Sequence, residues 1–362
     1  MSDAAPPPPA PAERPLVTFF VMAYAQQTHV REAIAGAFAQ TYQPLEIILS
    51  DDCSPDGTFR VMEEMAAAYR GPHRVILNRN PKNLGLVRHV DRIMEIASGE
   101  LVVQNAGDDV SEPERTAVLV EAWLASEGRD GRPAGRRADF VHSSLRQLHP
   151  DGRLTPSPVH DHRALRPGVT PLQIVRHEPK LIGASAAWTP ALFERFGPLG
   201  AEATIEDFPL AFRAALEGGI AYVDRPLVRY RTGGYSETRL PDPGEDDLYG
   251  FWLKRTRWLL SFDRAYLRDM AGREFPQRAA CEAECRRRIE LGALHVRLAE
   301  AGRGARLALL PRTAATALRR GTVQPLKDWL KYAFDGLYLA LRRRRARPAG
   351  GGTGGAARGA RP

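Results

Sequence analysis

The chain has 362 residues, of which 43% are hydrophobic and 26% are charged, and its net charge at pH 7 is +8. This is the balance of a globular protein with enough length for one large domain or two smaller ones. The three cysteines form no Cys-x-x-Cys pair, which excludes a disulfide framework and a structural zinc site. No stretch reaches the roughly 20 apolar residues that span a bilayer, and the N-terminus has no apolar signal core. We therefore predict a cytoplasmic protein that can touch the inner face of the cell membrane.

The first third of the chain alternates between strand and helix patterns. Runs of β-branched and leucine residues mark the strands, and apolar residues at helical spacing mark the helices. The predicted strands are Val17–Ala23, Leu45–Ser50, Arg74–Leu77 and Leu101–Asn105, and the predicted helices are Val30–Gln40, Phe59–Tyr69 and Leu86–Ala97. This order predicts an α/β fold, a Rossmann-like three-layer α/β/α sandwich with a mostly parallel sheet.

The rest of the chain has weaker patterns, and an irregular, lid-like segment is expected at 154–180. The later predictions are a strand at Asp139–Ser143, a helix near Ile205–Gly219, a strand-turn pattern at Ile220–Arg231 and Arg-rich helices after Asp246. We expect four regions, namely a disordered proline-rich terminus (1–14), the α/β domain (15–245), a helical basic region (246–345) and a disordered tail (346–362).

Polar residues follow the elements of the first half, at Tyr24, Asp51-Asp52, Asn83 and Asp108-Asp109. Because the carboxyl ends of parallel strands lie along one edge of a sheet, we expect these residues to line one crevice. The pair Asp108-Asp109 is the most informative, since two adjacent carboxylates repel each other and favour a shared cation. The pattern predicts Mg²⁺ or Mn²⁺ carrying a diphosphate. The alternative is that Asp109 caps a helix that starts near Glu112.

Several blocks of the sequence occur in an order that is typical of one enzyme family. They are Leu16–Tyr24, Gln40-Thr41-Tyr42, the run Asp-Asp-Cys-Ser-Pro-Asp-Gly-Thr at Asp51–Thr58, Asn83-Leu84-Gly85 and Ser98-Gly99-Glu100. In these blocks the chain resembles the family 2 glycosyltransferases, inverting enzymes of the GT-A fold, over about residues 15–240. Two positions differ from the family pattern, because Ala25 replaces an asparagine and Ala106 replaces the leading acid of the Asp-x-Asp motif.

The resemblance implies that a nucleotide base binds at the ends of the first two strands. Asp52 is the favoured acid for this contact, because a carboxylate accepts hydrogen bonds from imino and amino groups. Asp51 is its neighbour in the motif, and Tyr24, next to Ala23, could stack on the base. Two alternatives stay open: Asp51 or Asp52 could cap the turn before Ser54, and Tyr24 could be a half-buried aromatic residue at a strand end.

The resemblance also implies a diphosphate site. Arg88 lies one turn into the helix that follows Asn83 and would reach a phosphate, although a surface arginine is an equally good interpretation. Asp108 and Asp109 would bind the metal. Many relatives have a histidine near this point of the fold, where Tyr230–Ser236 has none, so we expect diphosphate contacts from Arg231 or from backbone amides.

The motif Glu206-Asp207 matches the block in which the family has its general base. The resemblance assigns that role to Asp207, with Glu206 as the backup base. The alternative is that Asp207 caps the helix in whose first turn Pro209 would lie. Upstream, Gly183, Ala184 and Trp188 resemble the segment that lines the sugar and acceptor subsites. Trp188 could stack on a sugar or belong to the core.

The segment Leu326–Arg345 combines an apolar stripe at helical spacing with a basic cluster. Such a helix is typical of a peripheral membrane contact, and packing against its own domain is the alternative. We expect no nucleic-acid binding, because the basic tail lacks any known module for it.

Together these features predict a metal-dependent inverting glycosyltransferase. Its donor would be a nucleotide-diphosphate-sugar, with a UDP-sugar favoured, and its acceptor a saccharide or a lipid-linked hydroxyl in cell-envelope polysaccharide or glycolipid synthesis. Two alternatives remain. A nucleotidyltransferase shares a related fold but usually has a Gly-rich loop after the first strand, where residues 23–27 have none. A non-catalytic membrane-surface protein with a decayed site would explain Ala106.

Overall fold

The computed structural model describes residues 14–157, 164–200, 202–217, 219–232 and 248–333. The chain divides into two compact units, Met1–Glu237 with Trp258–Arg288, and Thr238–Arg257 with Ile289–Pro362. Residues 258–288 thus belong to the first unit, although they lie beyond the boundary expected at residue 245. The separation of an α/β domain from a helical region stays a prediction. Residues 1–13 and 346–362, which we expect to be disordered, lie outside the described residues.

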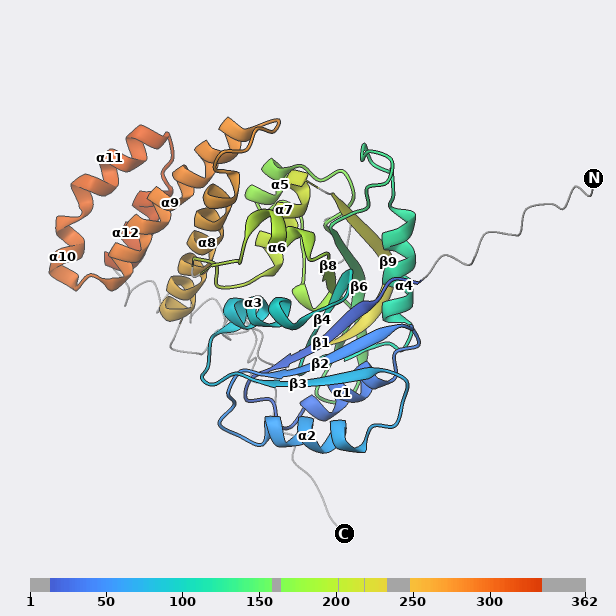
Figure 1. The fold of residues 1–362 in the computed structure, drawn as a ribbon. Helices are drawn as coiled ribbons and strands as arrows, with labels where there is room; N and C mark the ends of the chain where they lie inside the picture. The colour runs from blue at the N-terminus through green and yellow to red at the C-terminus, as the bar shows by residue number, and fades with distance from the viewer. Residues whose placement is uncertain (1–13, 158–163, 201, 218, 233–247, 334–362) are drawn as a thin grey trace, which may run out of the picture. The chain divides into compact units, whose positions relative to one another are not determined.

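The first unit is built around one sheet, in which nine strands are seen among the described residues (Figure 1). Their order is β3-β2-β1-β4-β8-β6-β9-β5, with β7 paired to β6. The strands are β1 Val17–Ala23, β2 Leu45–Asp51, β3 Arg74–Arg79, β4 Leu101–Ala106, β5 Val110–Ser111, β6 Phe140–Leu148, β7 Leu154–Pro156, β8 Ala186–Trp188 and β9 Ile220–Arg231. The first four run parallel, whereas β8, β5 and β7 are antiparallel to their neighbours. The mostly parallel sheet is confirmed.

Helices cover both faces of this sheet. The helices of this unit are α1 Val30–Phe38, α2 Thr58–Ala68, α3 Leu86–Ile96, α4 Arg115–Ala125, α5 Pro171–Val175, α6 Ala191–Phe196 and α7 Asp207–Glu217. Two longer helices, α8 Leu248–Met270 and α9 Arg278–Glu300, belong to it only through residues 258–270 and 278–288. Phe19 of β1 packs in the core that includes α1, α2 and α4, whereas Phe20 packs in the core that includes α3 and α7. Every residue of β1 is buried because both faces are covered, as in other parallel sheets. The three-layer α/β/α architecture is confirmed.

The ends of β1, β2 and β4 lie level with one another. Ala23 pairs with Asp51 in β2, and Met22 pairs with Ala106 in β4. The loops that follow these three strands therefore start from one edge of the sheet, as the strand order predicts. The helix-cap interpretation of Asp109 is wrong, because β5 follows this residue directly and α4 begins only at Arg115.

The largest differences from the predicted elements lie in the second half of the first unit. β6 continues to Leu148, well past the expected end at Ser143, and β9 is one strand in place of a strand-turn pattern. These two strands pair in parallel with register shifts near Ser144, which accommodate Pro226. Pairing between β6 and β9, which are distant in the sequence, therefore extends both strands beyond the ends that their local sequence patterns predict. The lid role of 154–180 stays a prediction.

The second unit contains α10 Arg303–Ala308, α11 Leu310–Arg320 and α12 Gln324–Ala333, with the last residues of α9. Its core joins Trp329 and Tyr332 to leucines of α9. Trp329 Nε1 donates a hydrogen bond to the Arg306 carbonyl at 2.7 Å. The expectation that the apolar stripe of 326–345 faces a membrane is therefore wrong for Trp329, which packs inside its own unit. Residues 334–345 lie outside the described residues.

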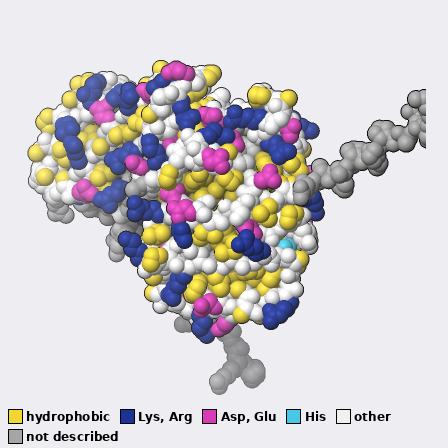
Figure 2. Space-filling model, in the orientation of Figure 1, with side chains coloured by type: hydrophobic (Ala, Val, Ile, Leu, Met, Phe, Trp, Pro, Cys, Tyr) yellow, Lys and Arg dark blue, Asp and Glu magenta, His cyan; other side chains and the backbone are white. Residues whose placement is uncertain are grey.

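No helix within the described ranges is both long and apolar enough to cross a bilayer. On the face shown in Figure 2, basic and acidic side chains are interspersed, so the arginines there share the surface with carboxylates.

Candidate functional site

Asp108 and Asp109 lie in the short connection between β4 and β5. Asp109 is buried, and its Oδ1 accepts a hydrogen bond from the backbone N–H of Arg231 at 2.8 Å. Its Oδ2 is buried with no hydrogen-bond partner among the described residues. Burial raises the pKa of Asp109 well above its usual value, and the charge of Asp108 raises it further.

These two acids fit the predicted divalent cation. A buried carboxylate oxygen that lacks a donor, next to a second carboxylate, is a suitable ligand for Mg²⁺ or Mn²⁺. Over the described part of the chain, no cluster of three or more His, Cys, Asp or Glu side chains could hold a metal. The protein therefore offers two acids, and water or substrate oxygens would complete the coordination of such an ion.

Arg231, at the end of β9, closes the loop of the acid pair. Its backbone binds Asp109, and its Nε donates to the Asp108 carbonyl at 2.9 Å. Its Nη2 reaches Glu32 Oε2 in α1 at 2.9 Å. A cation from the second half of the fold is thus held beside the acids, where the sequence suggests a diphosphate contact.

Arg115, in the first turn of α4, is fully buried behind the same loop. Its guanidinium donates to Ser111 Oγ at 2.8 Å and to the Ala184 carbonyl at 2.8 Å. Burial lowers the pKa of Arg115 to about 9, against the opposing effect of Asp109. Sequence reasoning missed this residue, because an arginine that begins a helix is usually a surface residue and its partners lie up to 69 positions away.

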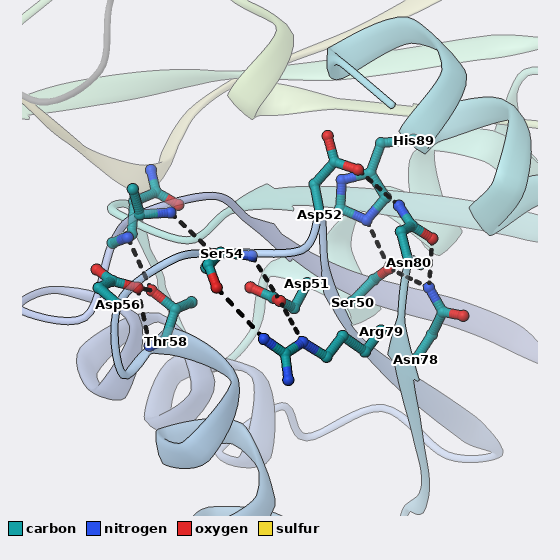
Figure 3. Close-up of polar contacts among 12 residues, drawn as sticks. Ser50, Asp51, Asp52, Ser54, Asp56, Thr58, Asn78, Arg79, Asn80 and His89 are labelled. Carbon is teal, nitrogen blue, oxygen red and sulfur yellow. Dashed lines mark hydrogen bonds and ion pairs between the residues drawn. The ribbon is translucent and has the colours of Figure 1, made fainter. Parts of the chain in front are cut away.

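Asp51 and Asp52 lie at the end of β2 and have separate partners (Figure 3). Asp51 Oδ2 accepts from the Ser54 N–H at 2.9 Å and lies 3.4 Å from Arg79 Nε. Asp51 therefore caps this turn, which is the alternative that the sequence left open.

Asp52 faces the loop before α3. Its Oδ1 accepts from Asn80 Nδ2 at 2.8 Å and from the Leu84 N–H at 2.9 Å, and its Oδ2 accepts from the Gly85 N–H at 2.9 Å. The carboxylate is thus fixed in one orientation by three donors.

The other predicted donor residues surround this loop and the end of β1. Ala23 is buried at the end of β1, and Tyr24, which follows it, is half-buried. Asn83 is exposed and accepts a hydrogen bond from the Gly85 N–H at 2.9 Å, so it shapes the entry to α3. Arg88 is exposed in the first turn of α3. Their exposure is compatible with both interpretations: Tyr24 as a stacking residue or a half-buried aromatic residue, and Arg88 as a phosphate ligand or a surface arginine.

Glu206 and Asp207 are two adjacent acids at the start of α7. Glu206 is only 2% exposed, whereas Asp207 is half-buried and thus open to a substrate. Burial, and then the charge of Glu206, raise the pKa of Asp207 to about 8. Burial also raises the pKa of Glu206, against a hydrogen bond from Gln104. A carboxylate with a pKa near neutrality is suited to proton transfer.

Gly183 supports this pair. A Cβ atom at this position would lie 2.8 Å from Glu206 Oε1 and 3.3 Å from Asp207 Cβ, so a larger residue would require the Glu206 carboxylate to shift. Ala184 is buried, and its carbonyl accepts from Arg115. The predicted stacking of Trp188 on a sugar is wrong in this structure, because its ring is 0% exposed and packs edge-on against Phe20 at 5.9 Å between ring centroids.

One hydrogen bond links Glu206 to β4, the strand that leads to the first acid pair. Gln104 Nε2 donates to Glu206 Oε1 at 2.6 Å, and Asp108 follows Gln104 by four residues in the same chain segment. The strand before the predicted metal acids is thus bonded to the acid next to the predicted base.

Residues 18–159 match the family model of glycosyl transferase family 2. In this segment the chain is similar to the family 2 glycosyltransferases. A putative glycosyltransferase, EpsE of Bacillus subtilis, is 33% identical over 101 residues, which are 28% of this chain and 36% of EpsE. A chondroitin synthase of Pasteurella multocida is 25% identical over 140 residues, 39% of this chain and 13% of that enzyme. The chain thus spans about a third or less of the length of these relatives.

Solved structures support the same fold. The mannosyltransferase PcManGT of Pyrobaculum calidifontis, in complex with GDP-Man and Mn²⁺, aligns with a TM-score of 0.52 at 20% identity, over 96% of this chain and 91% of that one. The GT-A-type fold is therefore confirmed. The family segment includes both Asp-Asp pairs but ends before Glu206-Asp207, so the base assignment depends on the motif and on the geometry around β4.

Proposed function

We propose that this glycosyltransferase moves a sugar from a nucleotide-diphosphate-sugar to an acceptor hydroxyl with inversion at the anomeric carbon. One observation carries the proposal: the half-buried Asp207, with its raised pKa, is next to Glu206, which accepts a hydrogen bond from β4, the strand that leads to the acid pair Asp108-Asp109. A proton acceptor and a site for a charged leaving group are the two parts that this reaction needs.

The donor would bind along the ends of β1 and β2. In the proposal Asp52 accepts hydrogen bonds from the base, Tyr24 stacks on it next to Ala23, and Arg88 and Asn83 border the phosphates. The GDP-Man in the mannosyltransferase neighbour supports a nucleotide-sugar as donor, and a UDP-sugar remains the favoured one for this chain. Arg231 donates to the backbone of the acid loop that the diphosphate would approach.

Asp108 and Asp109 would hold Mg²⁺ or Mn²⁺. When bound, the ion would offset the charge that develops on the leaving diphosphate. The unpaired Asp109 Oδ2 supports this assignment, and the Mn²⁺ in the neighbour is consistent with it. Arg115 would keep the loop of the two acids in place from behind through its bond to Ser111.

Asp207 is the proposed general base. The acceptor oxygen forms a bond to the anomeric carbon, the bond from that carbon to the diphosphate oxygen breaks, and the diphosphate leaves with the electron pair. The acceptor proton goes to Asp207, whose pKa near 8 favours this transfer. Glu206, which is closed off from solvent, would act through its charge on Asp207, and Gly183 and Ala184 would border the sugar.

The acceptor is proposed to be a saccharide or a lipid-linked hydroxyl in polysaccharide or glycolipid synthesis at the inner face of the cell membrane. The similarity to a chondroitin synthase supports a saccharide acceptor. Cell fractionation with and without residues 334–362 would test the membrane contact.

Turnover measurements test the proposed function. A panel of UDP- and GDP-sugars is first screened by thermal shift, because a donor that binds stabilises the folded state. Release of the nucleoside diphosphate is then followed with and without Mn²⁺ in the wild type and in Asp109→Asn. Metal-dependent release that Asp109→Asn abolishes is expected. Absence of metal-dependent turnover with every donor would overturn the proposal, and pyrophosphate release from nucleoside triphosphates with sugar phosphates would favour a nucleotidyltransferase.

A further inference from the structure

A buried chain of hydrogen bonds lies behind Asp52 and crosses three elements (Figure 3). Asn80 Nδ2 donates to Asp52, and Asn78 Nδ2 donates to Asn80 Oδ1 at 3.1 Å and to Ser50 Oγ at 2.9 Å. Ser50 Oγ lies 2.6 Å from Nε2 of His89 in α3. Asn78, Asn80 and His89 lie outside the sequence blocks that resemble the family, and Ser50 directly precedes one of these blocks.

The chain of bonds closes on itself. His89 lies in the first turn of α3, and its backbone N–H donates to the Gly85 carbonyl at 2.9 Å. The Gly85 N–H in turn donates to Asp52 Oδ2. Asp52 is therefore held from one side by Asn80 and from the other by the loop that starts the helix of His89. We call this ring of Ser50, Asn78, Asn80, His89 and Asp52 the Asp52 ring.

Charge and burial make the ring rigid. Ser50, Asn80 and His89 are buried, so each broken bond would leave a polar group without water. Burial lowers the pKa of His89, against the charges of Asp52 and Asp51, which keeps the imidazole neutral near pH 7. The carboxylate of Asp52 is then the charged group of the ring, and it accepts the hydrogen bond from Asn80.

We infer that Asn80 is the positioning residue for nucleotide binding by Asp52, and that His89 supports it through Ser50 and Asn78. This inference rests on the proposed function, because it presumes that Asp52 contacts the base. Three protein donors occupy Asp52, so the direction of the lone pair that remains on Oδ2 depends on Asn80 and on the Leu84–Gly85 amides. Losing Asn80 frees the carboxylate to turn away from a base, without removing any group that touches substrate.

Calorimetric binding of UDP in the presence of Mg²⁺ tests the inference. Asn80→Ala is expected to weaken UDP binding about tenfold, which corresponds to ~1.4 kcal/mol. The same variant should raise KM for the donor by a similar factor and leave kcat within about twofold. His89→Leu should weaken binding about threefold, whereas His89→Gln, which retains a polar group toward Ser50, should restore most of the loss.

Ser126→Ala is the matched control. Ser126 is a buried hydroxyl in another part of the first unit, where it bonds the Trp123 carbonyl and the Ala138 N–H. Its loss should lower the melting temperature and leave the Kd of UDP unchanged. An Asn80→Ala variant that loses stability but retains the wild-type Kd of UDP would overturn the inference. Equal UDP binding by His89→Leu and His89→Gln would overturn it as well, and this second test does not require that Asn80→Ala folds.

The outcomes separate the inference from the proposed function. A wild-type protein that binds neither UDP nor GDP contradicts the proposed function, and the inference falls with it. A wild type that binds UDP, together with variants of unchanged Kd, contradicts the inference alone.

Discussion

Two Asp-Asp pairs follow β2 and β4, the two strands that flank β1, and the structure surrounds them differently. Asp52 receives three hydrogen bonds, and its neighbour Asp51 caps a turn. Asp109 receives one from a backbone amide, and its second oxygen is buried without a donor in the described part of the chain. Asp52 thus has a donor on each oxygen, whereas Asp51 and Asp109 each have one buried oxygen without a donor among the described residues. Asp51 is paired with Arg79, whereas Asp109 lies beside a second carboxylate and favours a cation. The number of donors that the fold supplies makes the difference.

Asp109→Asn should give the largest change in activity. The variant loses a charged metal ligand, so we expect kcat to fall about a thousandfold, or ~4 kcal/mol. Its melting temperature without metal should rise, because burial raises the pKa of Asp109 and the ionised side chain therefore destabilises the folded state near pH 7. Mn²⁺ binding by electron paramagnetic resonance and thermal melts check both parts. A lower melting temperature would contradict the comparison.

Asp207→Asn should lower kcat by about a hundredfold, at the lower end of the usual contribution of a general base. The wild-type rate should rise tenfold per pH unit below about pH 8 and level off above it, since Asp207 acts when ionised. Because the folded pKa exceeds the ordinary 3.8, the folded state binds a proton more tightly, and stability falls as pH rises from 3.8 to about 8.

Stopped-flow or steady-state rates and melts across this pH range measure both effects of Asp207. The Asn variant should lose the dependence of rate on pH and part of the dependence of stability. A retained rate profile in Asp207→Asn would assign the base to another group.

Asp52→Asn should have the opposite effect on stability to Asp109→Asn. An amide cannot accept from Asn80, Leu84 and Gly85 in the same way, so we expect the free energy of unfolding to fall by about 1–3 kcal/mol. UDP binding should weaken as well. Denaturant titrations of Asp52→Asn and Asp109→Asn measure the change in the free energy of unfolding of each variant. If both changes have the same sign, the two acid pairs do not differ in the way described.

Arg79→Ala should have the smallest effect. Arg79 pairs with Asp51 at 3.4 Å; the arginine side chain is 48% exposed and the Asp51 side chain is buried. We expect a loss of about 1 kcal/mol, the upper end of the range for exposed pairs. A loss above 2 kcal/mol would mean that Asp51 needs this cation and that the turn depends on more than its hydrogen bond to Ser54. Urea unfolding in low and high salt measures the contribution.

Much of the fold could be predicted because the signals are local. The seven residues of β1 have a continuous apolar run, and α3 starts after Gly85, where φ is +78°, as the glycine there suggests. The ends of β6 and β9 could not be predicted, since pairing between distant strands extends both. Trp188 and Trp329 show the same limit, because an aromatic residue in a sequence does not reveal whether its ring is covered.

The sequence by itself determined the order of strands and helices and the location of the acid pairs at strand ends, because hydrophobic periodicity and turn residues act over a few positions. Only the tertiary structure decided which carboxylates have a buried oxygen without a donor among the described residues, which acids have a raised pKa and which arginines are buried. The partners that make those decisions come from far along the chain: Arg231 lies 122 residues from Asp109, and Gln104 lies 102 residues from Glu206. Burial and hydrogen bonding at such separations exist only once the two halves of the sheet have joined.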